Sequence, residues 1–205
     1  MSTHGLSVVE AETGTITGGG SVVKPASAWT GEANISGGAY VDLKAGASLS
    51  VPLPAADEPQ NIYPIVNQGI APSGSTRWST ARGPLGTTSN GGAGAQGITE
   101  APAGAAAVVG TTDGDVALDA LLVQPQLSTV AVDGSGGQAT LYVSAAPKSM
   151  VRTVNLPAGF HLSQQAFDAS GRPVTAGPKQ NAADQSGRIS VAPGGFTWVS
   201  LVRNQ

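Results

Sequence analysis

Cysteine is absent from this chain of 205 residues, and charged residues make up only 11% of it. Without cysteine the chain has neither disulfide bonds nor a thiolate zinc site. The net charge is −3 and the ten Lys and Arg residues are scattered, so the basic surface that nucleic-acid binding needs is missing. No apolar run approaches the roughly 18 residues of a membrane span. We therefore expect neither a nucleic acid nor a membrane as partner.

Sustained helical periodicity is also missing from the sequence. Glycine and proline contribute 29 and 14 residues, a composition that favours turns over helices. Short segments with apolar alternation, such as AYVDLKA and FTWVSLV, recur with turn sequences between them. This pattern predicts an all-β protein: a jelly-roll-type β-sandwich with additional C-terminal strands or a small second β-sandwich.

A change of composition at QPQLST predicts two parts of the chain. Carboxylates are dense before this segment, whereas the later Asp residues each lie beside Gly or Ser in turn-like sequences. We assign residues 6–125 to a first β-sandwich and residues 126–205 to a small β-sandwich appendage, which could instead add strands to the first. The core of this second part is expected to contain Phe160, Phe167, Phe196 and Trp198.

Three carboxylates lie in segments that are predicted to be strands. SVVEAETGT places Glu10 and Glu12 on one strand face, because side chains two apart point the same way. In DVALDALLV, Asp119 lies in a strand that is apolar on both faces. A buried carboxylate needs a cation, backbone N–H groups or a proton, and a hard cation such as Ca²⁺ suits carboxylates from two strands. The alternative is that Glu10 and Glu12 are solvated charges that protect a strand edge.

The same segments resemble the carbohydrate-binding modules of families 6 and 35. VEAETGTITGGGSVV, SGGAYVDL and VALDALLV follow one another in the order typical of that family, over about residues 6–125. The resemblance implies a galactose-binding-domain-like β-sandwich with a structural Ca²⁺ bound by Glu10, Glu12 and Asp119. It also implies non-catalytic binding of a carbohydrate by a module of a secreted, bacterial, glycan-active enzyme, whose catalytic domain belongs to the same parent chain.

Residues 73–104 show no clear strand pattern and are predicted to be a long functional loop. Aromatic rings stack on the apolar faces of sugars, and planar polar side chains bind sugar hydroxyls. The predicted carbohydrate-binding residues are therefore Trp78, Arg77, Arg82 and Asn90 in this loop, and Trp29 in an earlier turn-rich stretch. The alternative for Trp78 is a residue that anchors the loop to the protein body.

Sequence signatures of catalysis are missing. There is no Gly-x-Ser-x-Gly motif and no cysteine nucleophile, and His161 has no acidic partner nearby. An acid pair for glycoside hydrolysis would have to come from Glu32, Asp42, Glu100, Asp113 and Asp115. We expect the chain not to be an enzyme. The alternatives are a structural accessory domain of a glycoside hydrolase or lyase that binds no glycan itself, and a catalytic domain.

Overall fold

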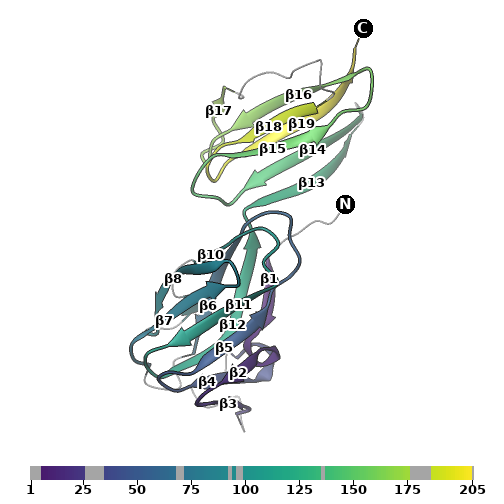
Figure 1. Ribbon diagram of the computed structural model, residues 1–205. Helices are drawn as coiled ribbons and strands as arrows, with labels where there is room; N and C mark the ends of the chain where they lie inside the picture. The colour runs from purple at the N-terminus through teal and green to yellow at the C-terminus, as the bar shows by residue number, and fades with distance from the viewer. Residues whose placement is uncertain are drawn as a thin grey trace. The chain divides into compact units, whose positions relative to one another are not determined.

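A computed structural model describes residues 6–25, 35–67, 72–91, 94–95, 99–134, 137–175 and 186–204. In these residues the secondary structure consists of strands and two short 3-10 helices, which confirms the prediction of an all-β sandwich protein. None of the described residues form a helix long and apolar enough to cross a membrane. The chain divides into two compact units, Leu6–Pro125 and Gln126–Gln205 (Figure 1).

The first unit contains a seven-stranded sheet that is built around one long strand, β12. The sheet path runs through β10 (Thr99–Ala101), β6 (Gln60–Val66), β12 (Val116–Pro125), β4 (Tyr40–Leu43) and β3 (Gly20–Val23). In addition, β1 (Ser7–Glu10) pairs with β12 and β9 (Gly94–Ala95) pairs with β6. Because β12 has partners on both edges and a sheet below it, its residues are almost all buried.

A five-stranded sheet forms the other layer of the first unit. Its order is β2 (Thr15–Thr17), β5 (Ser48–Pro52), β11 (Ala107–Thr112), β7 (Ser75–Thr80) and β8 (Gly83–Ser89). Alternate residues of both sheets, among them Leu49, Val108 and Leu121, point inward and form one apolar core. The outward positions of the five-stranded sheet are mostly Ser and Thr, as expected for a solvated face.

The prediction of a long loop over residues 73–104 is wrong. This segment contains β7, β8, β9 and β10. The buried residues of β7 and β8 are Thr76, Trp78 and Thr88, and Leu85 is only partly buried against the core, so the usual apolar alternation of a strand does not show in the sequence.

The second unit has a five-stranded and a two-stranded sheet. The larger sheet has the order β13 (Leu127–Gly134), β14 (Gly137–Ser144), β19 (Phe196–Arg203), β16 (Phe160–Phe167) and β17 (Pro173–Val174). The smaller sheet pairs β15 (Met150–Asn155) with β18 (Ser186–Val191). The two sheets share a small core in which the buried residues are Leu127, Ile189, Val191 and Val199.

The expected aromatic core of the second unit is not present. Thr197 and Val199 point inward from β19, so Trp198 between them points outward, and 40% of its surface is exposed. Phe160, Phe167 and Phe196 are only partly buried and lie outside the buried core cluster. Of the aromatic residues of this unit, Tyr142 packs against the core cluster instead.

Candidate functional site

Glu10 and Glu12 do not share a strand face. β1 ends at Glu10, and the next residues form a 3-10 helix, η1 (Ala11–Thr13), that contains Glu12. The turn is held by the Thr13 hydroxyl, which donates to the Glu10 carbonyl at 2.7 Å. The predicted strand over SVVEAETGT is therefore wrong beyond Glu10.

A second 3-10 turn, η2 (Ser36–Gly38), connects two of these carboxylates. The Ser36 N–H donates to both Oδ atoms of Asp119, at 2.9 and 3.1 Å. The Ser36 hydroxyl donates to Oε1 of Glu10 at 2.7 Å. Ser36 thus connects a side chain of β1 to a side chain of β12. The two strands are also neighbours in the sheet, where Glu10 pairs with Ala120.

Gly37 fits closely against the glutamates. Its φ of +61° is in the left-handed region that favours glycine. A Cβ atom on Gly37 would lie 2.8 Å from Oε1 of Glu12 and 3.1 Å from Cδ of Glu10. Any other residue would therefore push the two glutamates away from this turn.

The carboxylates are only partly satisfied by the protein. Oε2 of Glu10 and Oε2 of Glu12 are buried, and no described residue forms a hydrogen bond with them. Asp119 is 4% exposed. Burial raises the pKa of the Asp119 carboxyl, the Ser36 N–H opposes this rise, and the charges of Glu10 and Glu12 add to it. The alternative interpretation, in which the two glutamates are solvated edge charges, does not fit their buried oxygens.

The chemistry of this cluster, which we call the Glu10–Glu12–Asp119 cluster, suits a hard divalent cation. It offers carboxylate oxygens from three side chains. Two of these oxygens, Oε2 of Glu10 and Oε2 of Glu12, are buried without a hydrogen-bond partner among the described residues. Among the described residues, however, no group of three or more Asp, Glu, His or Cys side chains has the close spacing of a formed metal site. The structure thus shows that the three carboxylates are close together and that two of their oxygens lack partners among the described residues. The bound Ca²⁺ ion stays a prediction.

Trp78 and Asn90 are core residues and do not form a sugar-binding surface. Trp78 is 1% exposed, and its Nε1 donates to the Thr88 hydroxyl at 2.7 Å. Asn90, also 1% exposed, accepts a hydrogen bond from Thr76 at 2.6 Å and donates one to Thr112 at 2.8 Å. A sugar ring cannot stack on a buried indole, so the carbohydrate-binding prediction is wrong for both residues. Trp78 instead anchors its segment to the protein body.

The other predicted sugar ligands do not assemble into a site in the described residues. Arg77 is exposed on the outer face of the five-stranded sheet. Arg82 lies in the turn between β7 and β8, where its Nη1 donates to the Ala103 carbonyl at 2.7 Å. Trp29 lies outside the described residues. No aromatic face therefore accompanies the two arginines.

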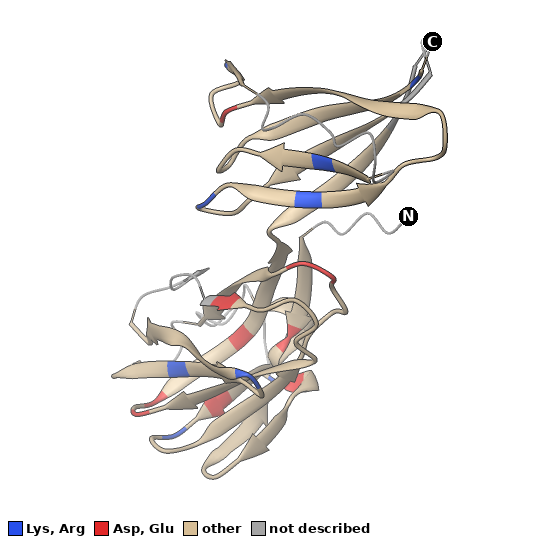
Figure 2. Cartoon of the chain, turned by 45° about the horizontal axis from the view of Figure 1, so that its top comes forward, with Lys and Arg blue, Asp and Glu red and all other residues tan. Residues whose placement is uncertain are grey.

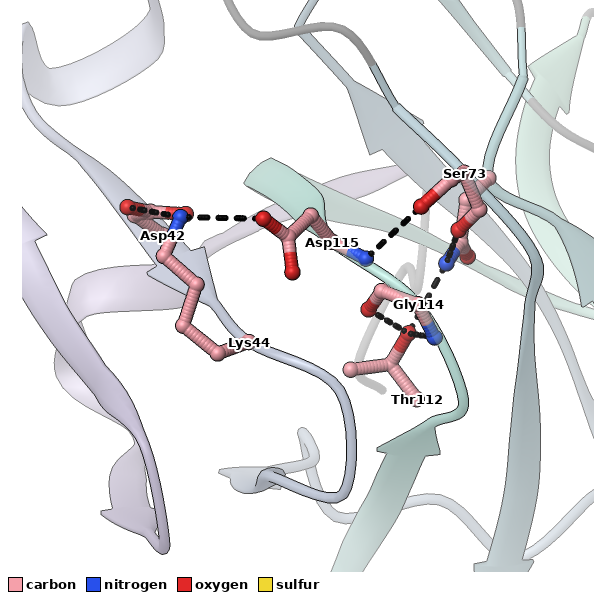
Figure 3. A network of polar contacts seen from close by, with 7 residues as sticks. Asp42, Lys44, Ser73, Thr112, Gly114 and Asp115 are labelled. Atoms are coloured by element: carbon pink, nitrogen blue, oxygen red, sulfur yellow. Dashed lines mark hydrogen bonds and ion pairs between the residues drawn. The ribbon is translucent and has the colours of Figure 1, made fainter.

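Two acids that could have formed a catalytic pair are joined by a lysine (Figure 3). Nζ of Lys44 lies 3.2 Å from Oδ2 of Asp42 and 3.2 Å from Oδ2 of Asp115. The hydrogen bonds to Asp42 and Asp115 raise the pKa of the Lys44 ammonium. In the same network the Asp115 N–H donates to the Ser73 hydroxyl at 3.2 Å. The network fastens the turn between β11 and β12 to the end of β4.

Comparison with known proteins gives similarity to solved structures only. No protein-family profile matches the chain, and no curated protein matches it significantly. A crystal structure of an exo-β-1,3-galactanase from Phanerochaete chrysosporium, with β-1,3-galactotriose, is 16% identical with a TM-score of 0.45, over 60% of this chain and 30% of that one. The catalytic unit of a thermostable α-1,3-glucanase from Streptomyces thermodiastaticus strain HF3-3 is 20% identical with a TM-score of 0.41, over 66% of this chain and 29% of that one.

The chain thus spans less than a third of each of these two structures. Membership of carbohydrate-binding-module family 6 or 35 is not shown. The expectation that the chain is not an enzyme is corrected: both similar structures are of enzymes that hydrolyse glycans, and one of them is a catalytic unit. The lack of a familiar catalytic motif in the sequence therefore does not exclude catalysis.

Proposed function

We propose that the chain recognises a glycan as part of an extracellular glycan-degrading enzyme, and that a structural Ca²⁺ stabilises its first unit. The observation that carries this proposal is the meeting of three distant sequence motifs at η2. The Glu-x-Glu, Ser-Gly-Gly and Leu-Asp motifs that carry the resemblance to families 6 and 35 lie within hydrogen-bonding distance of one another at Ser36.

The Glu10–Glu12–Asp119 cluster explains what a cation would do here. Two buried carboxylate oxygens without partners destabilise the folded state, and so does the mutual repulsion of three neighbouring acids. A bound Ca²⁺ would neutralise the cluster and supply the missing partners. Ser36 and Gly37 would keep the carboxylates in place, and β1 would then be held firmly against β12.

Thermal unfolding with and without calcium tests the cation. We expect the melting temperature of the whole chain to rise by several degrees from EDTA to millimolar CaCl₂. An ion present at a hundredfold excess over its Kd adds about 2.7 kcal/mol to the stability of the state that binds it. Asp119→Asn and Glu12→Gln should lose the response to calcium. Asp115→Asn, a carboxylate outside the cluster, is the matched control and should keep it. Equal melting temperatures in EDTA and CaCl₂ would contradict the proposed ion.

Glycan recognition is tested separately with the whole chain in calcium. The fraction of protein that co-sediments with cellulose, chitin, β-1,3-glucan and galactan should exceed that of an unrelated β-sandwich protein on at least one polymer. Hydrolysis of the same polymers is followed by release of reducing ends. If the chain retains no polymer and cleaves none, the glycan part of the proposal is refuted and a structural accessory role takes its place.

A further inference from the structure

One face of the second unit exposes aromatic and aliphatic side chains. Trp198, the third residue of β19, is 40% exposed, and Val130 of β13, Val143 of β14 and Val202 of β19 are also exposed. These residues lie on the side of the five-stranded sheet that faces away from the core formed by Leu127, Ile189, Val191 and Val199. Contiguous apolar surface on a sheet is typical of a binding face.

The strand register shows that these side chains form one continuous surface. Leu141, Trp198 and Gln165 are directly paired across β14, β19 and β16. Residues that pair directly across strands point to the same face of a sheet. The next row pairs Val143 with Phe196 and Phe196 with Phe167. We call this surface the aromatic face; it consists of Val130, Leu141, Val143, Gln165, Phe167, Phe196, Trp198 and Val202.

At one end of the aromatic face two rings pack against each other. The rings of Phe167 and Phe196 stack with their centroids 4.7 Å apart and an interplanar angle of 19°. Such a stack fixes the orientation of both side chains. The ring of Trp198 is one row further along β19, between Leu141 and Gln165. A ligand that binds there meets a preformed surface.

No Asp, Glu, Lys or Arg belongs to the aromatic face, in the part of the chain that the structure describes. Arg152 and Arg188 lie on the separate two-stranded sheet, and the carboxyl of Asp168 is bound within a turn. Arg203 lies over the ring of Phe160 at the end of the sheet. Figure 2 shows the same distribution, with charged residues on few of the strands in this unit. An uncharged ligand fits this surface best, because a charged one would find no Asp, Glu, Lys or Arg on it, and His161, opposite Val202, is hydrogen-bonded to the Asn204 side chain.

Polar groups of the right kind lie beside the exposed indole. Gln165 is exposed next to Trp198, and no described residue forms a hydrogen bond with its side-chain amide. Ser163 and Ser200 form the next directly paired row. A sugar offers an apolar face of C–H groups and a rim of hydroxyls, and an indole beside an amide and two hydroxyls is complementary to both.

The size of the face also favours a polysaccharide over a protein partner. Four strands spaced at about 4.8 Å and six residue steps of about 3.3 Å give a surface of roughly 300 Å². A stable protein–protein interface buries about 800 Å² on each partner. An extended sugar chain needs only a narrow strip, and the row from Phe196 to Val202 along β19 supplies one.

We propose that the aromatic face binds an uncharged polysaccharide chain, with Trp198 stacked on a sugar ring and Gln165 hydrogen-bonded to its hydroxyls. This inference rests on the proposed function, glycan recognition, and it assigns that recognition to the second unit. The sequence predicted it in the segment around Trp78, which is buried.

The test measures binding of the whole chain, in calcium, to cellulose, chitin, β-1,3-glucan and galactan, with the anionic polymer polygalacturonate for comparison. On a neutral polymer that the wild type binds, Trp198→Ala should weaken binding about tenfold, the effect of losing roughly 1.4 kcal/mol of stacking. Gln165→Ala should weaken it several-fold, and Trp198→Phe should recover part of the loss. Val151→Ala is the matched control, since Val151 is also exposed, at 51%, but lies on the two-stranded sheet.

Tryptophan fluorescence gives a second, site-specific signal. Trp198 is exposed to the quencher acrylamide, whereas Trp78 is buried and shielded. A soluble oligosaccharide of the polymer that binds should protect part of the wild-type fluorescence from acrylamide. The protected part should be missing in Trp198→Phe.

The outcomes separate this inference from the proposed function. Undiminished binding by Trp198→Ala would overturn the assignment to the aromatic face and leave glycan recognition standing. Tighter binding to polygalacturonate than to any neutral polymer would overturn it too. Failure to bind any polymer would overturn both proposals. A dimer in sedimentation that Trp198→Ala dissociates would assign the face to a second copy of the chain, and a fall of several degrees in melting temperature for this variant would show that the face is covered by the chain itself.

Discussion

The two units of this protein use tryptophan in opposite ways. Trp78, in STRWST, is 1% exposed and belongs to a core in which seventeen of the described residues are buried, whereas Trp198, in FTWVSLV, is 40% exposed above a core with four such residues. Each tryptophan lies in a strand and has a threonine or serine close by in sequence. The difference is the strand face: β7 turns Trp78 toward Thr88, which accepts its N–H, and β19 gives its inward positions to Thr197 and Val199. The larger core encloses an indole, whereas the strand above the smaller core exposes one.

Truncation of the two tryptophans should show this contrast most strongly. Trp78→Ala leaves a large cavity and removes the partner of the Thr88 hydroxyl, so we expect it to destabilise the first unit by about 3–5 kcal/mol. Trp198→Ala, on an exposed sheet face, should destabilise the second unit by less than about 1 kcal/mol. Urea unfolding followed by circular dichroism measures both. Equal losses of stability in the two variants would refute the contrast.

The sequence reveals the fold class because turn residues and apolar alternation recur over most of its length. It does not reveal β7 and β8, since their most deeply buried residues are Thr76, Trp78 and Thr88, whose side chains form hydrogen bonds in the folded state. Thr76, Thr88 and Thr112 each lie inside with a side-chain partner. Such pairs cannot be seen in a single-residue pattern, because each residue looks polar by itself.

The carboxylate cluster was predictable in its members but not in its geometry. Asp119 stands out because it interrupts a strand that is otherwise apolar on both faces. The role of Ser36 was missed: its N–H and hydroxyl reach two strands that are 26 and 83 residues away along the chain. The Ser-Gly-Gly sequence around it was the available signal, since Gly37 needs both its positive φ and the space beside the glutamates.

Two glycines allow the packing of the two cores to be compared directly. A Cβ on Gly110 would lie 2.7 Å from the ring of Trp78, which is buried and hydrogen-bonded and cannot move. A Cβ on Gly187 would clash with the end of the Leu162 side chain, which is only partly buried and can rotate. We expect Gly110→Ala to destabilise its unit by about 1–3 kcal/mol and Gly187→Ala to cost clearly less. Chemical denaturation of both variants checks this, and a larger loss for Gly187→Ala would show that the small core is the tighter one.

A carboxylate in a turn should add a similar, small amount of stability in both units, because this contribution does not depend on the core. Asp113 accepts hydrogen bonds from the N–H and hydroxyl of Ser75, and Asp168 accepts them from Ser170 and from the Arg172 N–H. Hydrogen bonds from Ser75 lower the pKa of the Asp113 carboxyl, and those from Ser170 and Arg172 lower that of Asp168, from an ordinary value of 3.8.

A carboxyl whose pKa is lower in the folded protein adds stability above its unfolded pKa and loses that contribution as the pH falls through the folded value. Asp113→Asn and Asp168→Asn should therefore each be slightly less stable than the wild type at pH 7, and the difference in stability should shrink as the pH falls below 3.8. The urea midpoints of the variants and the wild type, measured from pH 7 to pH 2.5, give this difference in stability at each pH. A gap that stays constant with pH would mean that the two turns depend on the shape of the side chain and not on its charge. Since both turns are exposed, the result should be the same whether the core beneath is large or small.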